Sequence, residues 1–207
     1  MHQTRQEVTR KIPIERKGTK YVARASSNTQ NSIPVVVAMR DVLSLAKTAK
    51  EVKALIHNKA LKLNGRLVRD LNEPIMLFNI LEADKKYKLV LLETGRFSFE
   101  PTKDNERLCK VMSRVLVSEN RMQLNMHDGT NIIGSKDIKV GDSIYVSFDG
   151  KIKSHISLDK ARECVVISGK YSGNKGKISS IDKENKTAII KFKDRETELK
   201  TSSVVAI

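Results

Sequence analysis

Apolar residues recur at helical spacing from residue 35, and they mark the first predicted element of the chain. Ser32 stands where a helix cap is expected, and Pro34 falls in the first turn, where its missing N–H costs nothing. The apolar positions are Val35, Val36, Met39, Val42 and Leu43. This spacing predicts a helix that begins directly after Ser32.

A second helix is predicted a few residues later. Thr48 and Glu51 form a capping-box pattern, in which the N-cap hydroxyl accepts from the backbone N–H of Glu51 and the Glu51 carboxylate accepts from the backbone N–H of Thr48. The apolar face consists of Ala49, Val52, Leu55 and Ile56. The short separation between the two patterns predicts a tight helix pair.

A β-hairpin is predicted after the second helix. Leu61 and Leu63 alternate with Lys62, and the dipeptide Asn64-Gly65 precedes a further apolar pair. Both residues of an Asn-Gly turn accept a positive φ, which a two-residue hairpin requires. The predicted order is therefore helix, helix, hairpin.

Strands dominate the pattern from Tyr87 onward. Alternating apolar residues, with Asp128-Gly129 and Asp149-Gly150 as turns, predict a small antiparallel sheet or barrel. The C-terminal part repeats this style around a Gly-rich loop, and about five short strands there predict a small barrel of the SH3-like kind.

We therefore expect an α+β protein with a basic tail and three compact units. The tail shows no regular period and is expected to become ordered on a partner. The expected parts are a tail at residues 1–31, a helical module at 32–83, a central β domain at 84–157 and a C-terminal barrel at 158–207.

Positive charge is segregated along the chain, whose formal net charge is +15. Residues 1–30 carry seven basic and two acidic side chains, residues 31–70 eight and three, and residues 160–207 eleven and six, so each block has a net charge of +5. Residues 71–159 carry thirteen of each sign. A chain that lies against a polyanion places Lys and Arg where phosphates are, although a solvated face is the other reading of a charge run.

Composition argues against several function classes. The longest clear apolar run, Val35 to Met39, is five residues long, whereas a membrane span needs about 18 to 20. The N-terminal stretch lacks the apolar core of a secretory signal. Cys109 and Cys164 lie in no Cys/His cluster. We expect a cytoplasmic protein with no membrane, no metal, no cofactor and no small-molecule substrate.

The sequence offers no catalytic pair. His57, His127 and His155 have no partner that the sequence identifies, and Asp128 and Asp142 read as turn formers rather than as paired carboxylates. We therefore expect no catalytic residues and no enzyme.

Residues 40–70 carry basic side chains at positions that lie outside the apolar faces of the predicted helices and hairpin. Such a face suits the phosphates of a folded RNA, whose helices are recognised mostly by shape and backbone. The candidate RNA-binding residues here are Arg40, Lys47, Lys50, Lys53, Lys62, Arg66 and Arg69.

Three features of this stretch resemble the alpha-L RNA-binding module, which is shared by small-subunit ribosomal protein four, some pseudouridine synthases and tyrosyl-tRNA synthetases. The features are Ala46-Lys47-Thr48 at the start of the second helix, Leu55-Ile56 near its end, and the hairpin of residues 61–65. The resemblance implies that the helices and the hairpin contribute to one basic RNA-binding face.

A second motif lies at residues 165–178, where glycines separate two apolar strands. A Walker loop needs four residues between its glycines and a following Lys-Ser/Thr, and neither is present. The motif resembles instead the KOW motif of ribosomal and transcription-elongation proteins, in which glycines let a loop turn sharply between strands of an SH3-like barrel. The loop would present Lys170, Tyr171, Lys175 and Lys177, with the tyrosine free to stack on a base or sugar. The alternative is a Gly-rich turn with solvated lysines.

Over nearly its whole length, the chain resembles the archaeal and eukaryotic small-subunit ribosomal protein four-e family. The resemblance implies a structural constituent of the small ribosomal subunit that binds small-subunit ribosomal RNA and contacts neighbouring ribosomal proteins. In the basic tail we expect RNA contacts from Arg16, Lys17 and Lys20. The segments that carry the resemblance are residues 12–22, 32–43, 125–133 and 140–146.

Two alternatives share these motifs. An RNA-modifying enzyme or a tRNA synthetase would need a large α/β or nucleotide-binding domain, and residues 71–159 are too few and too strand-rich for either. A translation or transcription factor that binds RNA transiently would carry the same motifs, and the sequence leaves this alternative open.

Overall fold

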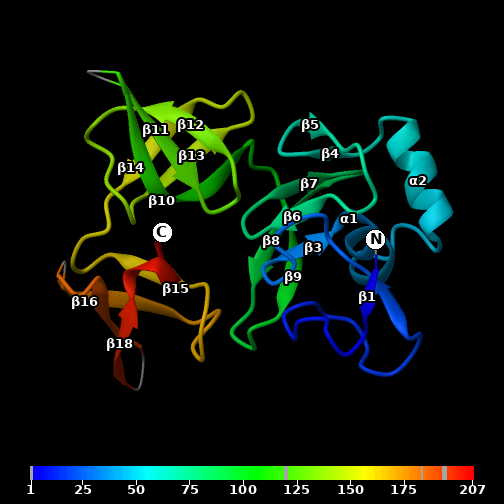
Figure 1. The fold of residues 1–207 in the computed structure, drawn as a ribbon, viewed down its shortest axis with the longest axis horizontal. Coiled ribbons are helices and arrows are strands. Elements are labelled where there is room, and N and C mark those ends of the chain that lie inside the picture. Colours follow the sequence, from blue (N-terminus) through cyan, green and yellow to red (C-terminus); the bar gives the residue numbers. More distant parts are fainter. Residues whose placement is uncertain (1, 119–120, 183, 193–194) are drawn as a thin grey trace. The chain divides into compact units, whose positions relative to one another are not determined.

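The computed structural model describes residues 2–118, 121–182, 184–192 and 195–207. The chain forms two compact units, which are described separately. The first comprises Met1–Leu91 and Arg96–Asn105, and the second comprises Leu92–Gly95 and Glu106–Ile207. Strands predominate in both units, and the described residues contain no helix long and apolar enough to cross a membrane (Figure 1).

The first unit is built around a five-stranded antiparallel sheet with the order β5-β4-β7-β8-β9. Its strands are β4 (Lys62–Leu63), β5 (Arg66–Leu67), β7 (Ile80–Glu82), β8 (Lys86–Leu91) and β9 (Phe97–Thr102). Two short pairs accompany it: β1 (His2–Thr4) with β2 (Tyr21–Ala23), and β3 (Ser32–Pro34) with β6 (Pro74–Met76). The helices are α1 (Val35–Val37), the π-helix η1 (Ala38–Val42) and α2 (Ala49–His57). Fully buried aliphatic side chains fill the unit, among them Ile33, Val35, Val37, Val52, Ile75, Ile80 and Leu89.

The first predicted helix forms, but Ser32 does not cap it. Ser32 lies in β3 opposite Met76, and its hydroxyl donates to the carbonyls of Ser27 and Asn28 at 3.1 and 2.8 Å. Pro34, in extended conformation, is the actual N-cap, and its side chain makes no capping hydrogen bond. Pairing with a strand some forty residues later therefore prevails over the local capping preference, which is a tertiary effect.

The predicted N-terminal tail is instead a folded part of the first unit. Strand β1 pairs with β2, and four apolar side chains of the segment from β1 to β3 are buried: two between β1 and β2, one in β2 and one after it. Those side chains are Val8, Ile12, Val22 and Ala25. The four positions do not sustain a helical or strand period, because the segment between β1 and β2 is an irregular loop. The periodic pattern therefore did not indicate that this segment is buried.

Strands β8 and β9 belong to the first unit, whereas the sequence pattern placed them at the start of a central domain beginning at residue 84. Strand β8 returns antiparallel to β7 after a tight turn, in which Ala83 N donates to Lys85 O at 2.9 Å. The buried side chain of Leu89 then joins the core of this unit. A domain boundary at residue 84 would therefore separate β7 from β8, which are hydrogen-bonded to each other.

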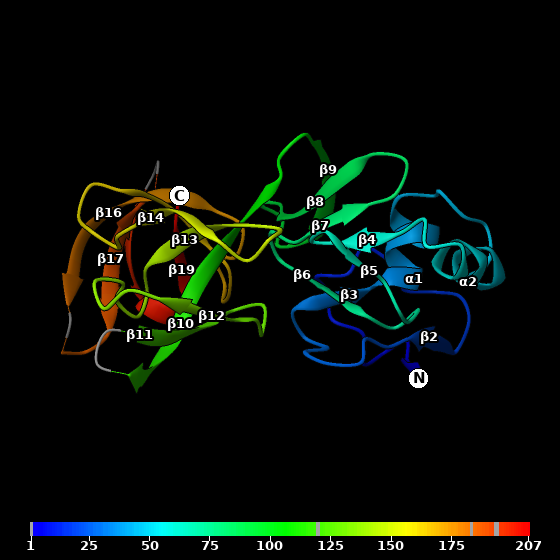
Figure 2. The same ribbon diagram turned by 90° about the horizontal axis from the view of Figure 1, so that it is seen from above.

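The second unit contains two five-stranded antiparallel sheets (Figure 2). The first has the order β12-β11-β10-β13-β14 and encloses Cys109, Val111, Leu124, Ile144 and Val146. Its strands are β10 (Glu106–Ser118), β11 (Arg121–Met126), β12 (Asn131–Gly134), β13 (Ser143–Ser147) and β14 (Ile152–Ile156).

The second sheet of this unit has the order β18-β17-β16-β15-β19. Its strands are β15 (Glu163–Val166), β16 (Lys175–Asp182), β17 (Thr187–Lys191), β18 (Glu196–Lys200) and β19 (Val204–Ala206), with the 3-10 turn η2 (Thr201–Ser203) before the last. The core contains Cys164, Val166, Ile178, Ile190 and Val204. The last strand, β19, returns to pair antiparallel with β15, the first strand of this sheet.

A buried lysine joins the two sheets of the second unit. Lys110 on β10 is only 1% exposed, and its ammonium donates to the carbonyls of Thr201 and Val204, both at 2.5 Å. Two carbonyls do not replace the hydration that a cation loses, so burial lowers the pKa of Lys110 from 10.5 to about 8. The sequence analysis counted Lys110 only as one of the thirteen basic side chains of residues 71–159, and its charge balance gave no indication of burial.

We expect the burial of Lys110 to make stability depend on pH. Between pH 8 and 10.5 the unfolded chain binds this proton and the folded chain has lost it, so the free energy of unfolding rises with pH across that window. Relative to Lys110→Met, which does not titrate, the native chain should gain about 3 kcal/mol between pH 7.5 and 10.5. Urea unfolding at several pH values measures this difference. The exposed Lys153, changed to Met, is the control, and a difference independent of pH for both variants would contradict the expectation.

Candidate nucleic-acid interface

Helix α2 and the residue before its N-cap hold three of the predicted RNA-binding lysines: Lys50 and Lys53 lie in the helix, and Lys47 precedes the N-cap Thr48. The Thr48 hydroxyl accepts from Glu51 N at 3.3 Å, and the Glu51 carboxylate accepts from Lys47 N at 2.7 Å, which lowers the pKa of Glu51. The predicted cap at Thr48 is thus confirmed, although the carboxylate binds one residue earlier than in a capping box. The buried Val52 anchors the other side of the helix to the core.

These three lysines are exposed and available to a ligand. Lys47 precedes the N-cap of α2, and Lys50 and Lys53 lie in its first two turns. Within the described residues, none of their ammonium groups forms an ion pair. An uncommitted ammonium on a rigid helix can neutralise a phosphate without first breaking an internal contact.

The hairpin of β4 and β5 presents the next set of basic residues. Asn64 and Gly65 have φ values of 52° and 79°, as the Asn-Gly turn predicts, and Asn64 Oδ1 accepts from Ile80 N at 2.9 Å, which ties the turn to β7. Lys62 is exposed opposite Glu82, and Arg69 is exposed beyond the hairpin.

Arg66 is less available than the sequence indicates. Its guanidinium forms an ion pair with Glu73, whose other carboxylate oxygen accepts from Arg69 N at 3.0 Å. The Glu73 side chain is mostly buried, while that of Arg66 remains exposed. A phosphate would therefore compete with an existing partner at this position.

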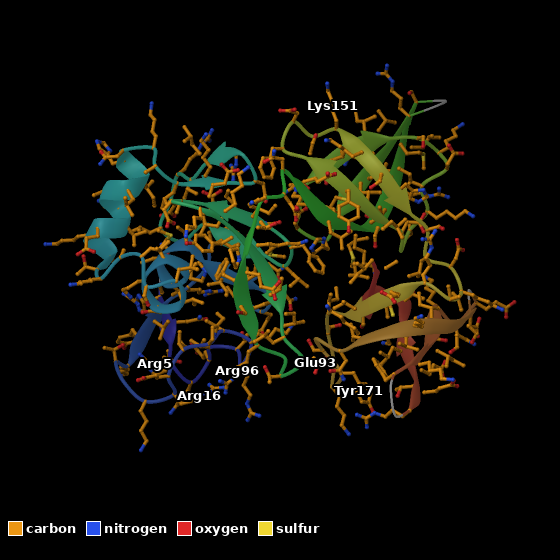
Figure 3. All side chains as sticks on the ribbon, turned by 180° about the vertical axis from the view of Figure 1, so that it is seen from behind. Arg5, Arg16, Glu93, Arg96, Lys151 and Tyr171 are labelled. Carbon is orange, nitrogen blue, oxygen red and sulfur yellow. The ribbon has the colours of Figure 1, made fainter. Side chains whose placement is uncertain are left out.

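The N-terminal loop brings together basic residues from two distant segments. Arg5 organises it by donating to Glu15 O, Thr19 O and Thr19 Oγ1 at 2.5 to 2.9 Å (Figure 3). The loop and η1 border a concavity of about 620 Å³ whose lining includes Lys17, Tyr21 and Arg40. Two predicted RNA-binding residues, Lys17 and Arg40, thus line one hollow, although the Arg40 guanidinium is already paired with Asp41 at 2.7 to 2.8 Å.

The other two predicted RNA-binding residues of this loop, Arg16 and Lys20, are exposed but differ in their intramolecular contacts. Arg16 is exposed, but its guanidinium also donates weakly to Val8 O at 3.5 Å (Figure 3). Lys20 is exposed and lies over the Tyr21 ring, with the ammonium 5.4 Å from the ring centroid. The loop therefore offers exposed cations beside a half-exposed aromatic ring.

In the second unit, the Gly-rich loop between β15 and β16 turns as the motif predicts. Gly169 and Gly173 have φ values of 90° and 93°. Gly173 also lies directly against the Leu92 segment, because a Cβ built there would be 1.8 Å from Leu92 O. Lys170, Lys175 and Lys177 are exposed on or beside this loop.

The Tyr171 ring is not free to stack as the sequence indicated. It packs on Phe192 with 5.6 Å between ring centroids, and the Arg195 guanidinium carbon lies 4.7 Å from the Tyr171 centroid. The ring packs, partly buried, against the apolar core of the C-terminal sheet (Figure 3). Apolar packing beside Phe192, which the motif does not include, accounts for the difference.

The titratable residues of the central sheet form structural networks. Asp142 is buried and accepts from His155 Nε2 at 2.7 Å, from Lys139 N at 2.8 Å and from Leu158 N at 3.0 Å. Asp142 thus forms its predicted turn, and it also supplies the partner of His155 that the sequence did not reveal.

A second network surrounds Asp128. It pairs with the mostly buried Arg107 at 2.7 Å and closes a turn by accepting from Thr130 N at 3.0 Å. The described residues hold no group of three or more His, Cys, Asp or Glu side chains that could bind a metal ion.

Comparison with known proteins places this geometry in a family. The model of the ribosomal family S4e matches residues 83–152, and the KOW motif matches residues 162–191. The small ribosomal subunit protein eS4 of Archaeoglobus fulgidus is 31% identical over 187 residues, covering 87% of this chain and 80% of that protein. The eS4 protein of Halobacterium salinarum is 31% identical over 191 residues, covering 87% and 82%.

A solved structure agrees with these sequence matches. The crystal structure of the 30S ribosomal protein S4e from Thermoplasma acidophilum matches with a TM-score of 0.73 and 26% identity, covering 86% of this chain and 95% of that chain. The similarity thus extends across both units rather than resting on a single motif. The chain belongs to the ribosomal S4e family.

Proposed function

We propose that this protein is a structural constituent of the small ribosomal subunit that binds ribosomal RNA through its basic surfaces. The observation that carries the proposal is the α2 surface, formed by Lys50 and Lys53 on the capped helix and Lys47 just before its cap, in a chain of the S4e family. All three lysines are exposed and form no ion pair within the described residues. Ribosomal proteins of this family are not a class of enzymes, and no catalytic step is assigned.

The helices and hairpin of the first unit act in this proposal as an alpha-L RNA-binding module. Its support is the capped helix α2, the Asn64-Gly65 turn and the attachment of that turn to Ile80 N. Lys62 and Arg69 extend the surface that α2 begins, while Arg66 contributes only after exchange with Glu73. The surface binds RNA backbone, because ammonium and guanidinium groups recognise phosphates rather than base edges.

The C-terminal sheet acts as an SH3-like KOW barrel that presents a rigid basic loop. Five antiparallel strands around one apolar core, with β19 returning to β15, support this assignment. Lys170, Lys175 and Lys177 bind phosphates, and Tyr171 positions the loop through its packing instead of stacking on RNA. The N-terminal loop, with Arg16, Lys17, Lys20 and Arg40, forms a third contact.

Sedimentation tests whether the protein is an integral component of the ribosome. We expect the protein to remain with purified cytoplasmic small subunits after a wash in high salt, because many simultaneous phosphate and protein contacts dissociate slowly together. Immunodetection in gradient fractions measures this. Release into the supernatant, together with retained binding to isolated ribosomal RNA, would instead establish the alternative of a factor that binds RNA transiently.

A further inference from the structure

Half of strand β10 has an unpaired edge. The strand runs from Glu106 to Ser118, but β13 pairs only with its residues 106–110. On the opposite side β11 pairs with it as far as Ser118. Within the described residues, no strand pairs with the other edge of residues 112–118, which we name the β10 arm. Backbone N–H and C=O groups along such an edge can accept a further strand.

The β10 arm exposes large aliphatic side chains. Val115, Leu116 and Val117 are 53%, 60% and 58% exposed, whereas Cys109 and Val111 in the same strand are fully buried. Cross-strand register places Val115 beside Gln123, and Gln123 beside Ile133, which is 60% exposed. Successive strand residues face opposite sides, so the arm is apolar on both faces. Clustered exposed apolar side chains on a protein surface mark an interaction site.

The charges around the arm are mainly positive. The Arg114 guanidinium donates to Lys136 O and Ile138 O at 3.3 and 3.2 Å, which holds its charge beside the arm. Among the described residues nearby in the chain, Arg121 and Lys136 are exposed and Asp137 is the acidic one; in the sequence, Glu119 directly follows the arm. A second copy of the arm would bring like charges together, whereas a segment with carboxylates would complement them.

We propose that the β10 arm is the docking edge for an extended segment of a second protein, which adds a strand to the sheet and carries aliphatic and carboxylate side chains. Main-chain hydrogen bonds to the free edge supply part of the affinity, and the aliphatic side chains bury Val115, Leu116 and Val117. RNA fits the arm less well, because aliphatic side chains have neither a π-face for stacking nor a charge for phosphates. The inference rests on the proposed function, since the second protein would be a neighbour in the small subunit.

A single introduced thiol tests this docking. Cys109 and Cys164 are both buried, and burial raises their pKa values to about 12 and about 11, so they react slowly with a maleimide near neutral pH. The thiol of a Leu116→Cys variant should be labelled rapidly in the free chain and in its complex with protein-free small-subunit ribosomal RNA. In assembled small subunits its labelling should be at least about tenfold slower, because an added strand covers the edge.

Matched variants distinguish an added strand on the β10 arm from a general loss of labelling in assembled subunits. Ile189→Cys places a thiol on another strand, at a position 38% exposed and with paired strands on both sides, and its labelling should not change between the RNA complex and the subunit. Leu116→Asp should leave the dissociation constant for ribosomal RNA within twofold of the native value and lower incorporation in competition with the native chain. Val117→Cys gives a second measurement of the same edge.

Three outcomes would overturn the inference. Protection of Leu116→Cys by ribosomal RNA alone would make RNA the occupant, and protection in the free chain with a dimeric mass would make it a second copy. Rapid labelling in assembled subunits would leave the edge without an occupant. Absence of the protein from small subunits would refute the proposed function itself, a result that is distinct from rapid labelling of a protein that is present.

Discussion

Replacing Gly173 with alanine should destabilise the second unit by about 3 kcal/mol or more. The new Cβ would lie 1.8 Å from Leu92 O and 2.6 Å from its carbonyl carbon, so backbone must move rather than a flexible side chain. The positive φ of 93° adds strain for any residue with a Cβ. Urea unfolding of the full chain, followed by a signal from the second unit, measures the loss.

Gly169 provides a matched control in the same loop. Its φ of 90° is nearly identical, but a Cβ there meets no atom within 4 Å. Gly169→Ala should therefore cost only the backbone strain, about 1 kcal/mol. Equal losses for the two variants would contradict the close approach of Gly173 to Leu92. A larger loss at Gly173 would identify the contact with Leu92 as the reason for glycine at that position.

Changing Lys47, Lys50 and Lys53 together to alanine should weaken binding to small-subunit ribosomal RNA on the order of a hundredfold at low salt. Each removed phosphate contact should also lower the slope of log affinity against log salt by about one. The native chain should lose on the order of a thousandfold in affinity between 50 and 200 mM salt if six to ten phosphates are contacted. Filter binding or fluorescence anisotropy across a salt series measures both effects.

The control for this variant removes the same number of charges elsewhere. Lys139, Lys151 and Lys153 are exposed in the part of the chain whose charges balance. Changing them to alanine should alter the affinity and the salt slope much less. Alanine favours helix, so α2 should remain folded in the first variant, which circular dichroism and thermal unfolding verify. Equal effects of the two triple variants would show that RNA binding follows total charge and not the α2 surface.

Local chemistry made several elements predictable from the sequence. Thr48 caps α2 and Asn64-Gly65 turns the β4–β5 hairpin because both depend on hydrogen bonds and φ values within a few residues. The Gly-rich loop between β15 and β16 was predictable for the same reason. Lys50 and Lys53 on α2 are exposed, as the sequence predicted, because the helical repeat places them on a different side of the helix from the buried Val52.

The sequence was a poorer guide to whether the candidate RNA-binding residues are free to contact RNA. Arg66 pairs with Glu73, Arg40 pairs with Asp41, and the Tyr171 ring packs on Phe192, so these residues, although expected to bind RNA, already have intramolecular partners. The exposed Lys177 also lies 3.9 Å from Glu163. Charge type and spacing identify a basic residue, but they do not show whether an acidic residue or an apolar core lies within reach in the folded chain.

The sequence by itself determined the nature of the local elements, the segregation of charge and the family resemblance. Only the tertiary structure decided that Ser32 joins a strand, that β8 stays with β7, and that Lys110 is buried beneath carbonyls more than ninety residues away. The physical reason is the sequence separation of the partners. The hydrogen bonds of caps and turns are formed with backbone groups a few residues away. Strand pairing and burial instead depend on which distant segments supply hydrogen-bond partners and exclude water. The exposed β10 arm belongs to this second class, because its aliphatic residues read as ordinary core until the sheet leaves one of their edges unpaired.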